Sequence, residues 1–169
     1  RANGIKHPVF CETATLPYLC RRIGPTTCKI SRVSDFMVFG GFPGCETARQ
    51  FEIVKTVYPS VQCFSNVLET VLPYGNAIHH PPAFLCNAGR VEATGGNFRH
   101  YYDGITPSVG RLIDAVDRER LKVAGALGAE TMPFVELFYR MGYTTKAACD
   151  TGIAYEAFHQ SEPDKWIPA

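Results

Sequence analysis

The pattern of apolar and polar positions changes about a third of the way along the chain. Residues 29–33 alternate polar and apolar side chains, which predicts a half-buried strand. The run 36–39 is apolar throughout, as in a strand buried on both faces, and residues 9–11 form another short β-prone run. Apolar residues then recur at helical spacing over 46–58, before Pro59. The first third therefore predicts a mixture of strands and helix.

The remainder of the chain has the pattern of helices. The clearest one begins at Thr106, a good N-cap residue, with Pro107 at the first helical position. Gly128 stands where the glycine that ends a helix is expected. The side chains of this helix that are expected to face the core are Val109, Leu112, Ile113, Val116, Val123 and Leu127. Further helices are expected over 66–72, from about Pro81, over 131–141 and over 151–159.

Composition narrows the class of protein. A hydrophobic content of 46% is typical of a folded domain, and the net charge of +1 gives no reason to expect nucleic acid as a partner. No apolar run approaches the roughly 20 residues needed to span a bilayer, so no membrane partner is expected either. The seven cysteines are odd in number and form no C-x-x-C pair, which argues against a disulfide framework or a metal site. A reducing cytoplasm is the expected location.

The main catalytic candidates are Asn76 and His80, which precede Pro81. In a helix the spacing of four puts both side chains on one face. Alternatively a helix begins at Pro81, because a residue before proline disfavours the α region. Either arrangement places the His80 imidazole near a helix N-terminus, where the dipole favours its neutral form. His79 competes for the role, although it should point away from Asn76, and a purely structural histidine is the alternative.

Other candidates have plainer interpretations. The loop 40–44 follows a predicted strand, but it lacks the G-x-G-x-x-G pattern and is expected to be a tight turn. Thr15 and Cys20 lie in a polar stretch beyond the first strand, where α/β folds bind ligands, although a strand-to-helix turn with Cys20 buried is the alternative. The aromatic segment 97–103 could line a pocket but is expected instead to pack between helices, and the charged run 118–122 is expected to be a solvated helix face.

Several segments together resemble the opine dehydrogenase family, which includes octopine, nopaline and carboxyethyl-norvaline dehydrogenases. Residues 12–21, Glu-Thr-Ala-Thr-Leu-Pro-Tyr-Leu-Cys-Arg, resemble the family stretch E-T-x-T-L-P-[YW]-x-C-R. The stretches 66–70, 76–81, 101–106 and 117–121 resemble successive segments of its helical domain. Each motif is weak alone, but their order along nearly the whole chain is specific.

The resemblance implies an α+β chain, with the end of an α/β Rossmann domain over 1–64 and an all-helical domain over 65–169. That second domain would be of the 6-phosphogluconate-dehydrogenase C-terminal-like type. Such enzymes use NAD or NADP to condense an α-keto acid such as pyruvate with an amino acid. By resemblance, His80 is the catalytic acid/base, Asn76 positions substrate, and Thr15 and Cys20 line the cleft.

The resemblance also indicates what the chain lacks. The family's nucleotide loop would precede Arg1, and its later Arg and Asp motif would follow Ala169. The chain is therefore expected to be the middle of a longer protein and inactive alone. Two alternatives stay open. One is a two-domain hydroxy-acid or polyol-phosphate dehydrogenase, which would tend to use a lysine as acid/base. The other is a non-catalytic helical dimerisation module. A homodimer is also an open arrangement for the enzyme.

Overall fold

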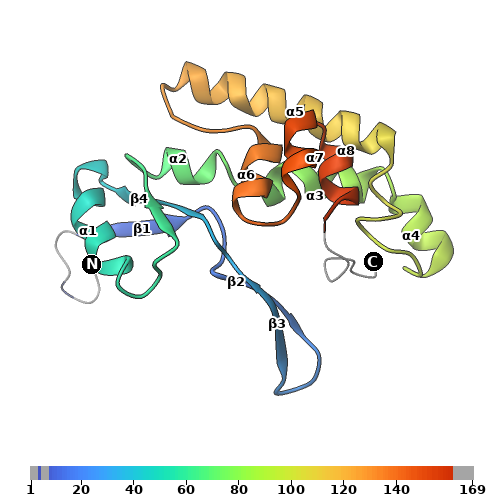
Figure 1. Cartoon of the computed structure of the whole chain (residues 1–169), viewed down its shortest axis with the longest axis horizontal. Coiled ribbons are helices and arrows are strands. Elements are labelled where there is room, and N and C mark those ends of the chain that lie inside the picture. Colours follow the sequence, from blue (N-terminus) through green and yellow to red (C-terminus); the bar gives the residue numbers. More distant parts are fainter. Residues whose placement is uncertain (1–3, 5–7, 162–169) are drawn as a thin grey trace.

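The strands lie near the beginning of the chain and form two small sheets. The computed structural model describes residue 4 and residues 8–161. The strands of this described part are β1 (Phe10–Thr13), β2 (Tyr18–Arg22), β3 (Cys28–Val33), β4 (Met37–Phe42) and β5 (Val61–Cys63). In the first sheet β4 lies between an antiparallel β1 and a parallel β5, and β2 and β3 form a separate hairpin. Figure 1 shows this hairpin projecting away from the rest of the molecule.

Helix α1 (Thr47–Val54) follows the short 3-10 turn η1 (Gly44–Glu46) and connects β4 to its parallel neighbour β5. Met37, Phe39 and Val61 of the sheet are buried, and Phe51 and Val54 of α1 pack against them. This small core explains why the apolar run 36–39 forms a central strand, as its pattern predicted.

The structure differs from the sequence-based interpretation at three places in this region. Residues 28–33 form β3, but the strand is largely exposed, because its partner is β2 rather than the main sheet. The stretch 15–21 turns into β2 and not into a helix. The predicted loop 40–44 is also shorter than expected, since Gly40 and Gly41 belong to β4. A side chain at Gly40 would collide with the Asn66 carbonyl, so glycine permits this close approach of two segments.

The rest of the described chain is helical, so the mixed α+β class is confirmed. The helices that follow α2 (Leu68–Val71) pack against one another as a single group (Figure 1). Its helices are α3 (Gly75–Leu85), α4 (Ala88–Thr94), α5 (Pro107–Ala126), α6 (Phe134–Arg140), α7 (Lys146–Thr151) and α8 (Ala154–His159). No helix of the described part is both long enough and apolar enough to cross a membrane.

Helix α3 begins six residues before the expected start at Pro81, and both Pro81 and Pro82 lie inside it. The prediction followed the local preference of a residue before proline. Prolines remove two backbone donors from the helix and weaken it. Burial of Ile78 and Ala83 against the neighbouring helices supplies stabilisation that the local pattern did not indicate.

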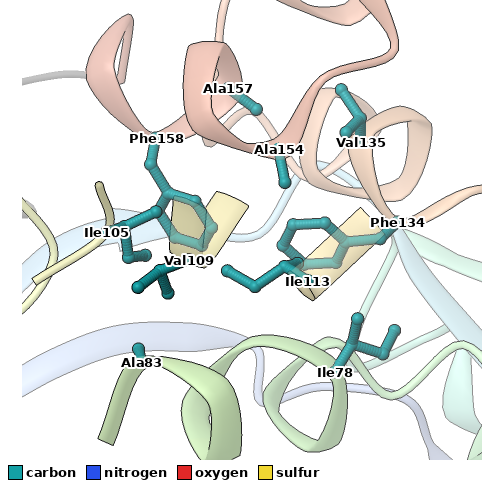
Figure 2. Packing of buried hydrophobic residues seen from close by; sticks show 10 residues of the cluster. All are labelled: Ile78, Ala83, Ile105, Val109, Ile113, Phe134, Val135, Ala154, Ala157 and Phe158. Atoms are coloured by element: carbon teal, nitrogen blue, oxygen red, sulfur yellow. The ribbon is translucent and has the colours of Figure 1, made fainter. Parts of the chain in front are cut away.

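The helical core lies between α3 on one side and α6 and α8 on the other, with α5 across them. Figure 2 shows Phe134 and Phe158 pointing toward each other above Ile78 and Ala83 of α3. All four are at most 3% exposed, so they belong to the buried core of the helical part. The complete cluster of buried residues is Ile78, Ala83, Ile105, Val109, Ile113, Phe134, Val135, Ala154, Ala157 and Phe158.

Helix α5 has the predicted cap but not the predicted buried stripe. The Thr106 side chain accepts a hydrogen bond from the Val109 backbone N–H, and Gly128 has a φ of +65° just after the helix. Val109 and Ile113 are buried. Leu112, Val123 and Leu127 are 42%, 52% and 55% exposed, because α3 and α8 cover only part of this long helix.

Most of the charged run 118–122 is exposed, as expected of a solvated helix face, but Arg120 departs from that expectation because it forms a buried ion pair with Asp117. The Arg120 guanidinium pairs with Asp117 at 2.6 Å, and the side chains are 9% and 12% exposed. Arg120 also donates to the Leu72 and Met132 carbonyls and to the Thr131 hydroxyl. Asp117 accepts the Phe134 backbone N–H at 2.9 Å. The pair therefore joins α5 to the end of α2 and to the start of α6.

Candidate active site

A cavity of about 750 Å³ lies between the β1–β2 segment and the helical core. Thr15 and Cys20 line it from the strand side, and Asn76 and His80 line it from α3. The structure thus brings all four sequence-predicted residues to one cavity, from segments about 60 residues apart. His100 and Tyr101 also line it, so part of the segment 97–103 faces the cavity and does not only pack between helices.

Helix α3 determines how the amide and the imidazole are placed. Because the helix begins at Gly75, Asn76 and His80 lie four residues apart on one face. The Asn76 amide nitrogen donates to the Tyr74 hydroxyl at 3.1 Å, which orients the amide at the cavity wall. Within the part of the chain that the structure describes, no hydrogen bond engages the His80 ring, which leaves its nitrogens available to a ligand.

His79 supports the cavity wall from within the core. It is 5% exposed, and its Nδ1 hydrogen-bonds the Gly75 carbonyl at 2.7 Å. A carbonyl can only accept, so Nδ1 carries the proton and the imidazole is held as one tautomer. Its ring contacts the rings of Phe134 and Phe158, with centroid distances of 5.4 and 5.2 Å. Burial lowers the pKa of His79 to about 3, so the ring stays neutral near pH 7.

His80 is also biased toward its neutral form, but not for the expected reason. It lies in the middle of α3, so the dipole at the helix start does not act on it directly. Partial burial lowers its pKa, and the nearby His100 and the Arg21 guanidinium lower it further. A neutral histidine can take a proton from a substrate ammonium group and return it to a leaving oxygen.

Three histidine rings lie close together at the cavity. The rings of His79 and His80 have a centroid distance of 4.1 Å, and those of His80 and His100 are 5.8 Å apart. Nevertheless, among the described residues no group of three or more His, Cys, Asp or Glu side chains is arranged to hold a metal ion.

The strand side of the cavity is tied to the helical side. The Thr15 side chain hydrogen-bonds Tyr143, whose hydroxyl pKa is raised by burial despite this bond. Cys20 is partly buried on β2, not fully buried as the plainer interpretation held, and its thiol contacts that of Cys28 on β3. Tyr143 was missed in the sequence, because no local pattern links it to a segment more than a hundred residues earlier. Arg21 also lines the cavity, and the alternation of side chains along a strand could have distinguished it from Arg22.

The glycine-containing loop after β4 is closed by the protein itself. The Gly41 backbone N–H donates to Thr47 Oγ1 at 3.0 Å, and this hydroxyl donates to the Ser65 carbonyl. A Cβ atom at Gly44 would lie 3.1 Å from the same carbonyl, so chain atoms fill the place that a phosphate would need. The described residues therefore do not fit the diphosphate of a dinucleotide here, and the tight-turn interpretation agrees with this geometry.

The depressed pKa of His79 makes stability depend on pH. An unfolded histidine titrates near 6.5, whereas folded His79 titrates at about 3. Between these values the unfolded chain binds a proton that the folded chain does not, so the free energy of unfolding falls as pH falls. We expect a loss of about 2 kcal/mol between pH 7 and pH 5 from this residue.

Urea unfolding at pH 7 and pH 5 checks this expectation. His79→Gln keeps an N–H donor but does not titrate, so its stability should change by about 2 kcal/mol less over the same range. His80 and His100 have the same direction of shift and leave a residual dependence in the variant. Equal pH dependence in both proteins would show that His79 is not held neutral by burial.

Known proteins match the chain over most of its length. The alpha-helical domain of the NAD/NADP octopine/nopaline dehydrogenase family matches residues 63–169. Opine dehydrogenase from Arthrobacter sp. is 34% identical over 143 residues, which cover 85% of this chain and 39% of that protein. The ocs protein of Agrobacterium tumefaciens is 28% identical over 122 residues, covering 71% of this chain and 33% of that protein. Vitopine synthase of Allorhizobium ampelinum is 25% identical over the same shares.

A solved structure agrees with this fold. Octopine dehydrogenase in complex with NADH and L-arginine matches with a TM-score of 0.63 and 16% identity. The match covers 95% of this chain and 42% of that structure. The chain thus spans about two fifths of the length of such proteins.

Proposed function

Because the chain belongs to the NAD/NADP octopine/nopaline dehydrogenase family, we propose that the whole protein is an NAD(P)H-dependent opine dehydrogenase. The reaction is the reductive condensation of an α-keto acid, such as pyruvate, with the amino group of an amino acid. We assign residues 1–64 to the end of its nucleotide-binding domain and residues 65–169 to its helical domain. The single observation that carries the proposal is the cavity that Thr15, Cys20, Asn76 and His80 line together.

The proposed reaction is balanced as follows. The amine nitrogen attacks the keto carbon, and the carbonyl oxygen leaves as water. A bound reduced nicotinamide would supply the hydride that reduces the resulting imine carbon, being itself oxidised to NAD(P)+, and one proton would complete the secondary amine. The cofactor supplies this hydride chemistry. The 169 residues contain no G-x-G-x-x-G loop, so the dinucleotide's main site is assigned to no residue here.

Proton transfer is the part assigned to His80. As a neutral base it removes a proton from the substrate ammonium group, which frees the lone pair for attack. As the resulting imidazolium it protonates the oxygen that leaves as water. Asn76, on the same face of α3 and anchored by Tyr74, is positioned to hydrogen-bond a substrate oxygen. Aromatic and aliphatic side chains around them exclude water from the reacting groups.

The alternatives have less support. No lysine lines the described part of the cavity, as a hydroxy-acid or polyol-phosphate dehydrogenase would be expected to require. The exposed Leu112 and Val123 on α5, and Leu127 directly after it, favour a surface for another protein or a second copy, as in a dimerisation module. Such a surface is compatible with catalysis, so turnover by the whole protein would exclude only the purely non-catalytic alternative.

Oxidation of NADH and NADPH by the whole protein tests the proposal. We expect oxidation that requires both pyruvate and an L-amino acid, with either component alone inactive. The 169-residue chain by itself should show no oxidation, because it lacks the nucleotide loop. Oxidation with the keto acid alone would assign the protein to the hydroxy-acid dehydrogenases, and no oxidation with any pair would contradict the proposal.

A further inference from the structure

The segment that carries Tyr101 is held against the helical core by main-chain contacts. The Asn87 amide, in a residue that is 7% exposed, donates to the Ala83 carbonyl at 2.7 Å and to the Gly104 carbonyl at 2.9 Å. The Ile105 backbone N–H donates to the Tyr101 carbonyl at 3.0 Å. A Cβ atom at Gly104 would lie 2.1 Å from a backbone carbonyl of the same segment, so glycine is required there. The position of Tyr101 therefore does not depend on its own hydroxyl.

The Tyr101 ring is fixed at the cavity by its aromatic neighbours. It stacks on Phe158 with a centroid distance of 5.6 Å and an angle of 11° between the ring planes. Its centroid lies 5.8 Å from that of His80 and 5.9 Å from that of His79. These contacts involve the ring alone and leave the hydroxyl unused. Because Tyr101 and His80 both line the cavity, the phenol lies beside the imidazole to which proton transfer is assigned.

The Tyr101 hydroxyl forms no hydrogen bond within the described part of the chain. Other tyrosines of the cavity differ, since the Tyr74 hydroxyl accepts from the Asn76 amide at 3.1 Å. Tyr143 hydrogen-bonds the Thr15 side chain. A tyrosine packed against a core usually finds a partner for its O–H. Burial raises the pKa of Tyr101, so its hydroxyl stays protonated near pH 7 and can donate to a molecule in the cavity.

We propose that Tyr101 is a further catalytic residue, whose hydroxyl donates a hydrogen bond to the keto oxygen while the amine attacks the keto carbon. Negative charge grows on this oxygen as the carbon–nitrogen bond forms. A donor directed at the oxygen therefore stabilises the transition state more than the bound substrate. His80 then protonates the same oxygen, which leaves as water. The inference rests on the proposed opine dehydrogenase activity for the identity of the reaction, but not for the binding of a carbonyl oxygen.

The variant Tyr101→Phe tests the role of the hydroxyl, because it keeps the ring that stacks on Phe158. With the whole enzyme, reduced nicotinamide, pyruvate and L-norvaline, we expect the rate constant of a single turnover to fall roughly 100-fold. Urea unfolding should show the same stability as wild type, since no hydrogen bond of the described chain is lost.

Tyr102→Phe is the matched control for this measurement. Tyr102 is the next residue, 41% exposed, and it is not among the described residues that line the cavity. Its ring lies under the Arg99 guanidinium at 4.2 Å, a contact that phenylalanine keeps. The control should turn over at the wild-type rate. An unchanged rate in Tyr101→Phe, or an equal loss in both variants, would overturn the inference and leave the proposed function intact.

Binding of sodium oxamate tests the contact without turnover. Oxamate has the carboxylate of pyruvate and a carbonyl oxygen in the place of the keto oxygen, but it is an amide and is not reduced. Calorimetric titration of the whole protein should show about fivefold weaker binding to Tyr101→Phe and wild-type binding to Tyr102→Phe. Equal oxamate affinity in wild type and Tyr101→Phe would overturn the inference. If no pair of keto acid and amine supports turnover but oxamate binding is weakened, the proposed function fails and the tyrosine contact stands.

Discussion

Replacement of His80 with alanine is expected to lower turnover of the whole enzyme by about 10²- to 10⁴-fold, the usual contribution of general acid–base catalysis. The ring lies at the cavity and its nitrogens have no hydrogen bond within the described chain. It is the imidazole of α3 that a substrate can reach, whereas His79 is 5% exposed and bonded to Gly75.

The loss of activity in His80→Ala should be found in kcat rather than in substrate binding, because the proposed role of His80 is proton transfer. Added imidazole should restore part of the turnover of His80→Ala, since the cavity left by the ring can accept it. His100→Ala is the comparison, because it removes a neighbouring imidazole of the same cavity, and it should retain most of the turnover. Full turnover in His80→Ala would show that another group transfers the proton.

Replacement of Arg120 with alanine is expected to destabilise the protein by about 3–5 kcal/mol, the effect of breaking a buried ion pair. The substitution leaves the Asp117 carboxylate, 12% exposed, without its cation. It also removes the donors to the Leu72 and Met132 carbonyls, which hold the end of α2 and the approach to α6. Phe134 at the start of α6 contacts His79, so the cavity wall should loosen as well.

Urea unfolding of the variants measures this effect. Arg49→Ala is the matched control, because it breaks an exposed Arg–Glu pair and should change stability by less than about 1 kcal/mol. Arg120→Met combined with Asp117→Leu should be less destabilising than Arg120→Ala alone, since it leaves no unpaired buried charge. Similar losses in Arg120→Ala and Arg49→Ala would mean that the buried network contributes no more than a surface pair.

Local sequence patterns predicted those helices and strands whose conformation is determined by residues close to them in the chain. The Thr106 cap and Pro107 defined the start of α5, and the apolar run 36–39 identified the central strand β4. The helical spacing of Asn76 and His80 correctly placed both on one face, although the start of their helix was wrong. In each case the signal lies within a few residues of the feature that it predicts.

Features that depend on distant contacts were not predicted. Prolines inside α3 are tolerated because Ile78 packs against other helices, which no pattern around Pro81 indicates. Arg120 has the sequence surroundings of a solvated residue, yet segments 48 residues before it and 12 residues after it bury it. Arg21 and Tyr143 reach the cavity only because the β2 strand and the helical core meet there.

The proposed reaction is tested most directly by the fate of the amino-acid nitrogen. The whole enzyme is supplied with pyruvate, reduced nicotinamide and ¹⁵N-labelled L-norvaline, and the product is analysed by mass spectrometry. We expect a secondary amine that has two carboxylates and retains the ¹⁵N label. The keto oxygen of pyruvate is absent from this product, because it leaves as water. Formation of lactate, with the labelled norvaline left unconsumed, would contradict the proposed reaction. The hydride would then have been transferred to a carbonyl carbon and not to an imine carbon.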